Sequence, residues 1–98
     1  MAVQDWPDSD TPAEVEAARE TVTNSWVPIL VQMTGESDSG AYSNEADLRE
    51  PNYQQTFFGP NYARLKSIKD KYDPNGLFIV GAGVGSEDWD SAGVCRKC

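Results

Sequence analysis

The segment that most constrains the fold of this chain is a short amphipathic run followed by the tetrapeptide DPNG at residues 73–76. Over residues 61–72, apolar and aromatic side chains recur every three to four positions, while basic side chains occupy the outer face. Asn61 can cap the first turn by accepting a hydrogen bond from a backbone N–H. Pro74 keeps the residue before it out of helical angles, and Gly76 permits a positive φ. The sequence therefore predicts a helix over 61–72 with a sharp end.

An earlier helix is predicted from a capping box at Thr11 and Glu14, with Pro12 in the first turn. Its apolar stripe recurs at three- and four-residue spacing and consists of Val15, Ala18, Val22 and Trp26. The apolar run at residues 26–33 fits a strand, from its β-branched residues, or a continued helix that Pro28 kinks or restarts. A helix is favoured, because the stripe leads into this run in phase.

Two short stretches are expected to be extended. Residues 41–47 form a short extended piece between turn residues, and residues 77–80, Leu-Phe-Ile-Val, form a short apolar strand. The predicted fold class is α+β, a small module of two to three helices with a few short strands. We expect a loose leader over 1–10, the module over 11–80, and a glycine-rich acidic tail over 81–98.

Charge is unevenly distributed along the chain, whose formal net charge is −8. Residues 1–60 hold eleven acidic side chains and two arginines, whereas residues 61–72 hold four basic side chains and one acidic one. The basic face is expected to be solvated or to pair with the acidic remainder. Nucleic-acid binding is not expected, because it depends on neutralised phosphates. No apolar run of about 18 residues and no signal-peptide pattern is present, so neither a membrane span nor a signal peptide is predicted.

Three motifs invite a chemical interpretation that their context does not favour. Alternating glycines at residues 81–85 follow the expected strand, but acidic residues come next, so a flexible loop is favoured over a phosphate site. The acidic clusters at 45–50 and 87–90 lack the ligand ladder of a calcium loop and are expected to be solvated. Cys95 and Cys98 cannot complete a zinc site without histidine. Free thiols, or a disulfide to a partner chain or a missing segment, are favoured over a redox role. No metal site is predicted.

The chain contains no histidine, so it cannot supply a Ser-His-Asp or Cys-His mechanism by itself. A tyrosine or a carboxylate can still serve as a base if its surroundings shift its pKa. The tyrosine candidates by residue type alone are Tyr42, Tyr53, Tyr62 and Tyr72.

The ordered motifs of residues 26–90 resemble the C-terminal segment of berberine bridge enzyme-like oxidases, FAD-linked members of the vanillyl-alcohol oxidase superfamily. The matching elements are Tyr42-x-Asn44-x-x-Asp47, Phe57-Phe58-Gly59-x-Asn61-Tyr62-x-Arg64-Leu65, Ile68-Lys69, Tyr72-Asp73-Pro74 and Leu77-Phe78. The continuation GVGSEDWD is similar to the fungal members, including those named isoamyl alcohol oxidases.

This resemblance implies roles for four residues. Tyr42 would face the substrate as a base or hydrogen-bonding group, and Asn44 would bind the flavin or position its neighbours. Asn61 would also bind the flavin, and Tyr62 would shape the substrate pocket. Loss of hydride to a flavin is easier when a base removes the alcohol proton. Many family members have a second tyrosine where this chain has Glu45, and many tether the flavin through His and Cys positions that are absent here.

The resemblance implies part of an enzyme that is not catalytic alone. The chain would be a C-terminal module or subunit that completes the flavin and substrate pocket of an FAD-dependent oxidase acting on an alcohol or similar C–H donor. Its partner would be a flavin-binding chain or upstream domain. Family members are often secreted. The alternative is a non-catalytic module that binds a partner or self-associates through aromatic surface around Trp26, Tyr53, Phe57 and Phe58.

Overall fold

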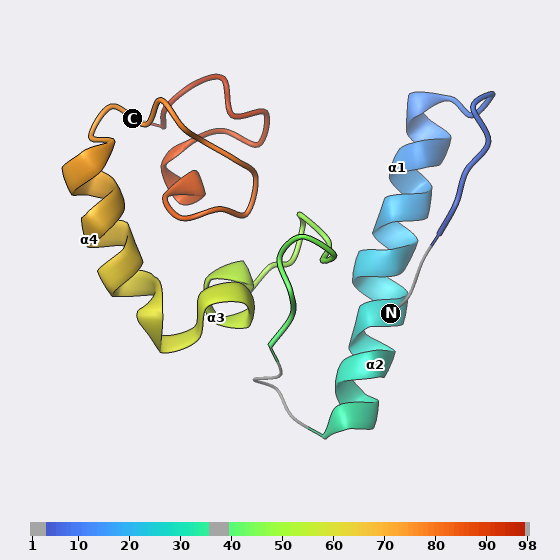
Figure 1. The fold of residues 1–98 in the computed structure, drawn as a ribbon. Helices are drawn as coiled ribbons and strands as arrows, with labels where there is room; N and C mark the ends of the chain where they lie inside the picture. Colours follow the sequence, from blue (N-terminus) through green and yellow to red (C-terminus); the bar gives the residue numbers. More distant parts are fainter. Residues whose placement is uncertain (1–3, 36–39, 98) are drawn as a thin grey trace. The chain divides into compact units, whose positions relative to one another are not determined.

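The computed structural model describes residues 4–35 and 40–97, and the chain divides into two compact units, Met1–Ser39 and Gly40–Cys98 (Figure 1). The regular elements of the described residues are helical. They are the α-helices α1 (Pro12–Thr21), α2 (Val27–Thr34), α3 (Tyr53–Phe58) and α4 (Tyr62–Tyr72), the π-helix η1 (Val22–Trp26), and the 3-10 helices η2 (Gly59–Asn61) and η3 (Ser86–Asp88).

The first unit is a helical rod preceded by a leader segment. The predicted capping box is confirmed: the Thr11 hydroxyl accepts from the Glu14 N–H at 3.4 Å, and the Glu14 carboxylate accepts from the Thr11 N–H at 2.8 Å. In the leader, the Trp6 ring faces the Arg19 guanidinium of α1, 5.6 Å from the ring centroid. Such a cation–π contact ties the leader to α1.

The predicted helix over residues 26–33 is confirmed, because α1 continues through η1 into α2 (Figure 1). In η1 the Val27 N–H donates to the Val22 carbonyl, five residues back. In a regular α-helix the ring of Pro28 would collide with the carbonyl four residues earlier. Proline also has no N–H to donate to that carbonyl. A wide π turn directly before Pro28 relieves this conflict. Gly35, with φ 68°, ends the rod.

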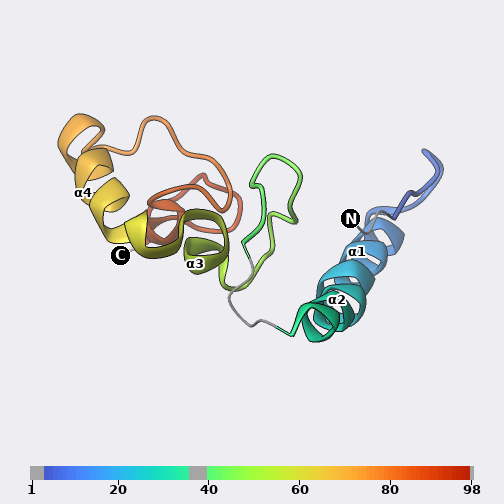
Figure 2. The same ribbon diagram turned by 60° about the horizontal axis from the view of Figure 1, so that its bottom comes forward.

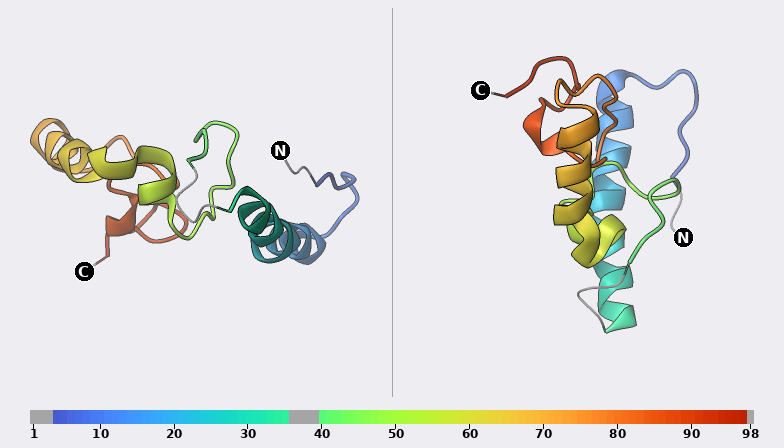
Figure 3. Two further views of the ribbon diagram at one scale, coloured as in Figure 1. Left: turned by 90° about the horizontal axis from the view of Figure 1, so that it is seen from below. Right: turned by 60° about the vertical axis from the view of Figure 1, so that its left-hand side comes forward.

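In the second unit, the segment after α4 folds back so that η3 lies beside α3 and α4 (Figures 2 and 3). The predicted helix over 61–72 is confirmed as α4. Asn61 stands at its N-cap position, but its side chain makes no capping hydrogen bond, so that predicted role is wrong. Pro60 and η2 lead straight into α4 and hold Asn61 at φ −83° and ψ −11°, whereas a capping side chain needs an extended backbone.

The strands of the predicted α+β class are not found in the described residues, where the only ladder contact is the isolated bridge between Trp89 and Arg96. Residues 77–80 and 41–47 are irregular. A strand is stable only when a neighbouring strand pairs with its backbone groups. The N–H groups of Leu77 and Phe78 donate instead to the carboxylate of Asp73. The fold shown is small and helical.

Apolar side chains of both units are open to solvent. No hydrophobic side chain of the described residues is fully buried, and Met33, Leu77 and Phe78 are each more than three-quarters exposed, at 79%, 78% and 77%. A chain of this length normally buries a modest core. Where such side chains gather into a patch within one unit, they offer a surface that another protein can cover. Within 4–35 and 40–97, no helix is long and apolar enough to cross a membrane.

Candidate functional site

Two of the predicted site residues are in direct contact. The side-chain amide of Asn44 donates a hydrogen bond of 2.8 Å to the hydroxyl oxygen of Tyr42. A turn makes this contact possible, because the Glu45 N–H donates to the Tyr42 carbonyl at 3.0 Å. Both side chains are exposed, Tyr42 by 65%. The contact does not use the phenol hydrogen of Tyr42 or the amide oxygen of Asn44, so both can serve a ligand.

The backbone next to Tyr42 is anchored on α3. The Ala41 N–H donates to the Thr56 carbonyl at 3.0 Å, and a Cβ on Gly40 would lie 3.6 Å from the same carbonyl oxygen. The position of the Tyr42–Asn44 pair within this unit therefore depends on the position of α3.

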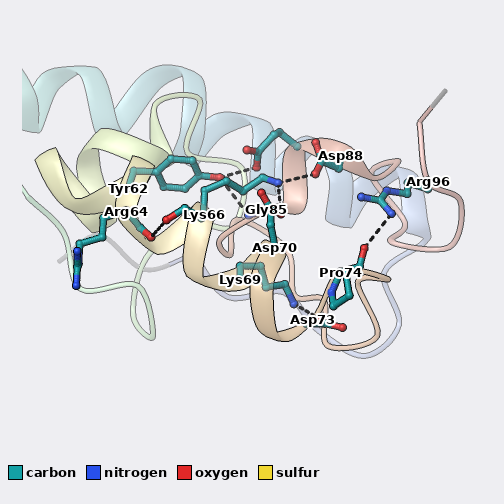
Figure 4. A network of polar contacts seen from close by, with 12 residues as sticks. Tyr62, Arg64, Lys66, Lys69, Asp70, Asp73, Pro74, Gly85, Asp88 and Arg96 are labelled. Carbon is teal, nitrogen blue, oxygen red and sulfur yellow. Dashed lines mark hydrogen bonds and ion pairs between the residues drawn. The ribbon is translucent and has the colours of Figure 1, made fainter.

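Tyr62, predicted to shape a substrate pocket, is held by the loop after α4. Its hydroxyl donates to Glu87 Oε2 at 2.5 Å and accepts from the Gly85 N–H at 3.1 Å (Figure 4). Burial, followed by the hydrogen bond to the Glu87 carboxylate, raises the pKa of Tyr62 far above its ordinary value of 10.0. Tyr62 therefore remains a neutral phenol and is not suited to act as a base.

A second tyrosine binds the same carboxylate oxygen, a contact that the sequence did not reveal. The Tyr53 hydroxyl donates to Glu87 Oε2 at 2.9 Å and accepts from the Ser86 hydroxyl at 3.1 Å. The rings of Tyr53 and Tyr62 meet edge to face, with centroids 6.2 Å apart at an interplanar angle of 85°. Glu87 was expected to be a solvated acid, but it is half-buried and joins α3 to α4.

The aromatic residues of the predicted self-association surface are divided between the two units. Trp26 lies in the first unit, and the other three lie in the second. The ring centroid of Phe57 lies 6.5 Å from that of Tyr53 and 6.3 Å from that of Phe58. The ring centroid of Phe58 lies 5.7 Å from that of Tyr62. These half-buried rings are the centre of the second unit, which leaves less of their surface for a partner.

Basic side chains of α4 pair with acidic ones, one of the two outcomes expected (Figure 4). Lys66 Nζ lies 2.7 Å from Asp70 and 2.9 Å from Asp88, so it links α4 to η3. The hydrogen bonds to these carboxylates raise the pKa of Lys66 to about 12. Lys69 bonds the carboxylate of Asp73 and the carbonyl of Phe78. Lys66 and Lys69 of α4 therefore form ion pairs and hydrogen bonds within the second unit.

The turn after α4 is organised by Asp73. One carboxylate oxygen accepts from the Leu77 N–H at 2.8 Å, and the other accepts from the Phe78 N–H at 3.0 Å and from the Lys69 ammonium. The hydrogen bond from Lys69, then that from Phe78, lowers the pKa of Asp73 to about 2. Gly76 permits the turn through its φ of 65°.

Acid should destabilise this turn. Because the folded pKa of Asp73 lies near 2 and its ordinary value is 3.8, its contribution is complete above about pH 4 and is lost as the pH falls toward 2. Asp73→Asn should lower stability at neutral pH and flatten the dependence of the urea midpoint on pH between about 4 and 2. Asp70→Asn, which removes a more exposed i,i+4 partner of Lys66, is the control and should keep the steeper slope. Equal slopes in the Asp73→Asn variant and the unmodified chain would contradict this role.

The glycine loop at 81–85 makes backbone hydrogen bonds to its neighbours. The Gly83 N–H donates to the Val80 carbonyl at 3.0 Å, the Ser86 N–H donates to the Gly83 carbonyl at 3.1 Å, and Gly85 is buried. With the bond from the Gly85 N–H to Tyr62, these bonds occupy backbone N–H groups that could otherwise face a phosphate. Across the described residues, no three His, Cys, Asp or Glu side chains are grouped to hold a metal.

The tail carries a free thiol and lines a hollow. Cys95 is an exposed free thiol, and Cys98 lies outside the described residues. An open hollow of about 190 Å³ lies between residues 79–81 and 86–93, and Trp89 lines it. None of the predicted site residues lines this hollow.

Comparison with known proteins supports the predicted resemblance. Residues 41–85 match the family model described as "Berberine and berberine like". A protein of Arthroderma benhamiae described as an uncharacterized FAD-linked oxidoreductase is 48% identical over 93 residues, 95% of this chain and 16% of that relative. The FAD-linked oxidoreductase patO of Aspergillus clavatus is 40% identical over 94 residues, 96% of this chain and 16% of that relative.

A solved structure, that of a VAO-type flavoprotein from Myceliophthora thermophila, has 36% identity and a TM-score of 0.77 to this chain. The similarity covers 94% of this chain and 17% of that one. The fold is therefore that of a segment of VAO-type flavoproteins. Residues 41–85, which include the Tyr42–Asn44 pair and Tyr62, form a berberine-like segment, and the predicted resemblance is confirmed. The chain spans about a sixth of the length of the curated relatives named above.

Proposed function

We propose that this chain is the berberine-like module, or a separate subunit, of an FAD-dependent oxidoreductase. It would complete the pocket in which an alcohol or similar C–H donor is oxidised. The observation that carries this proposal is the hydrogen-bonded pair of Tyr42 and Asn44, which is exposed and keeps ligand-binding groups free. The names of the relatives, FAD-linked oxidoreductases, support the choice of cofactor.

The two asparagines proposed to bind the flavin carry side-chain groups that suit it. FAD, when bound, would supply the hydride acceptor. Asn44 has an amide oxygen and a second N–H with which to hold a ring system that carries both donors and acceptors. Asn61, exposed at the start of α4, is the second proposed flavin ligand. Tyr42 would then hold or accept the substrate's hydroxyl proton, and Tyr62, fixed by Glu87, would form part of the pocket wall.

A flavin-binding domain or chain is the proposed partner. The exposed apolar side chains of α2 and of the turn after α4 supply surface that such a partner would cover. The module would belong to a larger two-domain flavoprotein, and the division into leader 1–10, module 11–80 and tail 81–98 stays a prediction. Self-association is the less favoured alternative, because Tyr53, Phe57 and Phe58 pack within their own unit.

Native purification tests this proposal. The chain should copurify with a larger polypeptide, or as part of one, and the preparation should show the visible absorption of oxidised flavin. Addition of an alcohol substrate without oxygen should bleach that absorption. A colourless, folded preparation of this chain with no flavin-binding partner would refute the proposal. A flavin-free oligomer in light scattering would instead support the binding-module alternative.

A further inference from the structure

We propose that Glu87 is a positioning residue that fixes the Tyr42–Asn44 pair through α3. The structural part of this proposal stands on contacts within the second unit. Its consequence for catalysis rests on the proposed function.

The first link joins Glu87 to two helices. Its Oε2 accepts from the hydroxyls of Tyr53, the first residue of α3, and Tyr62, the first residue of α4. Hydrogen bonds to an ionised acceptor are about twice as strong as neutral ones. Glu87 is half-buried, so losing the carboxylate would leave two phenol groups without this partner in a partly dry site.

The second link holds η3, and with it Glu87, in place. Asp88 forms an ion pair of 2.9 Å with Lys66 of α4, and its carbonyl accepts from the Lys97 N–H at 2.7 Å. The Gly85 N–H donates to the Tyr62 hydroxyl on the other side of Glu87. Because both flanks are attached, Glu87 acts as a fixed point for the tyrosines.

The third link leads from α3 to the site. Tyr53 begins α3, and the carbonyl of Thr56 in the same short helix accepts from the N–H of Ala41 at 3.0 Å. Tyr42 is the next residue, and its hydroxyl carries the bond from Asn44. A shift of α3 would therefore be transmitted to both side chains. Of the two tyrosines bound to Glu87, only Tyr53 lies on α3 and so connects Glu87 to Ala41 and Tyr42.

Amide hydrogen exchange on the full chain tests the structural part. In Glu87→Ala, exchange at Ala41 should rise by about tenfold or more, the effect of losing a charged hydrogen bond. Glu87→Gln, which keeps an acceptor oxygen, should show a smaller rise. Asp90→Ala is the control: Asp90 belongs to the same acidic cluster but bonds the Val94 N–H, so exchange at Ala41 should not change.

Two gentler variants keep the proposal falsifiable if Glu87→Ala does not fold. Tyr53→Phe removes only the hydroxyl on the path to Tyr42 and should speed exchange at Ala41 more than Tyr62→Phe does. Faster exchange at Gly85 with no change at Ala41, in Glu87→Ala or in Tyr53→Phe, would overturn the proposal, since Glu87 would then act only locally.

The catalytic part is measured on the flavin-containing protein. Glu87→Ala should slow flavin reduction by about tenfold at saturating substrate, and Glu87→Gln should recover part of that rate. A flavin-free protein would refute the proposed function, while the exchange data would still decide the structural link. Faster exchange at Ala41 combined with an unchanged rate of flavin reduction would overturn the effect of Glu87 on the reaction, while its structural link to Ala41 would stand.

Discussion

Gly76→Ala is expected to lower the free energy of unfolding by about 2–5 kcal/mol, through two separate effects. The first is backbone strain, because φ at Gly76 is 65° and an L side chain there costs about 1–2 kcal/mol. The second is steric overlap. A Cβ at this position would lie 2.7 Å from Cζ2 of Trp89 and 3.1 Å from two further atoms of the indole. Displacing a packed ring typically costs about 1–3 kcal/mol.

Gly35→Ala is the matched control for this prediction. Gly35 has nearly the same φ, 68°, but among the described residues no atom beyond its own helix and its chain neighbours lies within 4 Å of the position of its Cβ. Its substitution should therefore cost only the strain, about 1–2 kcal/mol. Urea unfolding followed by circular dichroism measures both variants. Equal losses of unfolding free energy in the two variants would show that the Trp89 ring moves aside freely. That result would contradict the packing of the tail against the turn after α4.

Features decided by neighbouring residues could be predicted from the sequence. The capping box at Thr11 and Glu14 and the end of α4 at residues 73–76 involve groups within a few positions of one another, so their spacing alone predicts them. The positive φ of Gly76 is of the same kind. Trp89, which makes that glycine sterically necessary, lies in the tail and carries no local signal.

The predictions that failed depended on context beyond the local pattern. The apolar residues 77–80 suit a strand, but Asp73 takes up the first N–H groups, and the described residues offer no neighbouring strand to pair with. The pairing of Glu87 with Tyr53 and Tyr62 spans 34 and 25 residues, and only the folded tail brings these groups together. The Tyr42 and Asn44 positions were found by family resemblance, and the structure adds their direct contact.

In the flavin-containing protein, Tyr42→Phe should lower the rate of flavin reduction by about 10²–10⁴-fold, the usual effect of removing a positioned acid–base group. The phenol oxygen is the group lost, and the ring remains. Stability should change little, because Tyr42 is 65% exposed and water can replace it as the partner of Asn44. Tyr72→Phe is the matched control: Tyr72 is 77% exposed at the end of α4 and lies outside the proposed site, so the rate should be unchanged.

The pH dependence of this loss distinguishes the two roles proposed for Tyr42. If Tyr42 removes the substrate proton, the factor by which Tyr42→Phe slows the reaction should change with pH, because the variant lacks the base. If Tyr42 only donates a hydrogen bond, the variant should be slower by the same factor at every pH. Asn44 donates to the phenol oxygen, so the phenol hydrogen of Tyr42 stays available to the substrate in either role. A Tyr42→Phe variant as fast as Tyr72→Phe would remove Tyr42 from the reaction and leave Asn44 to act on the flavin alone.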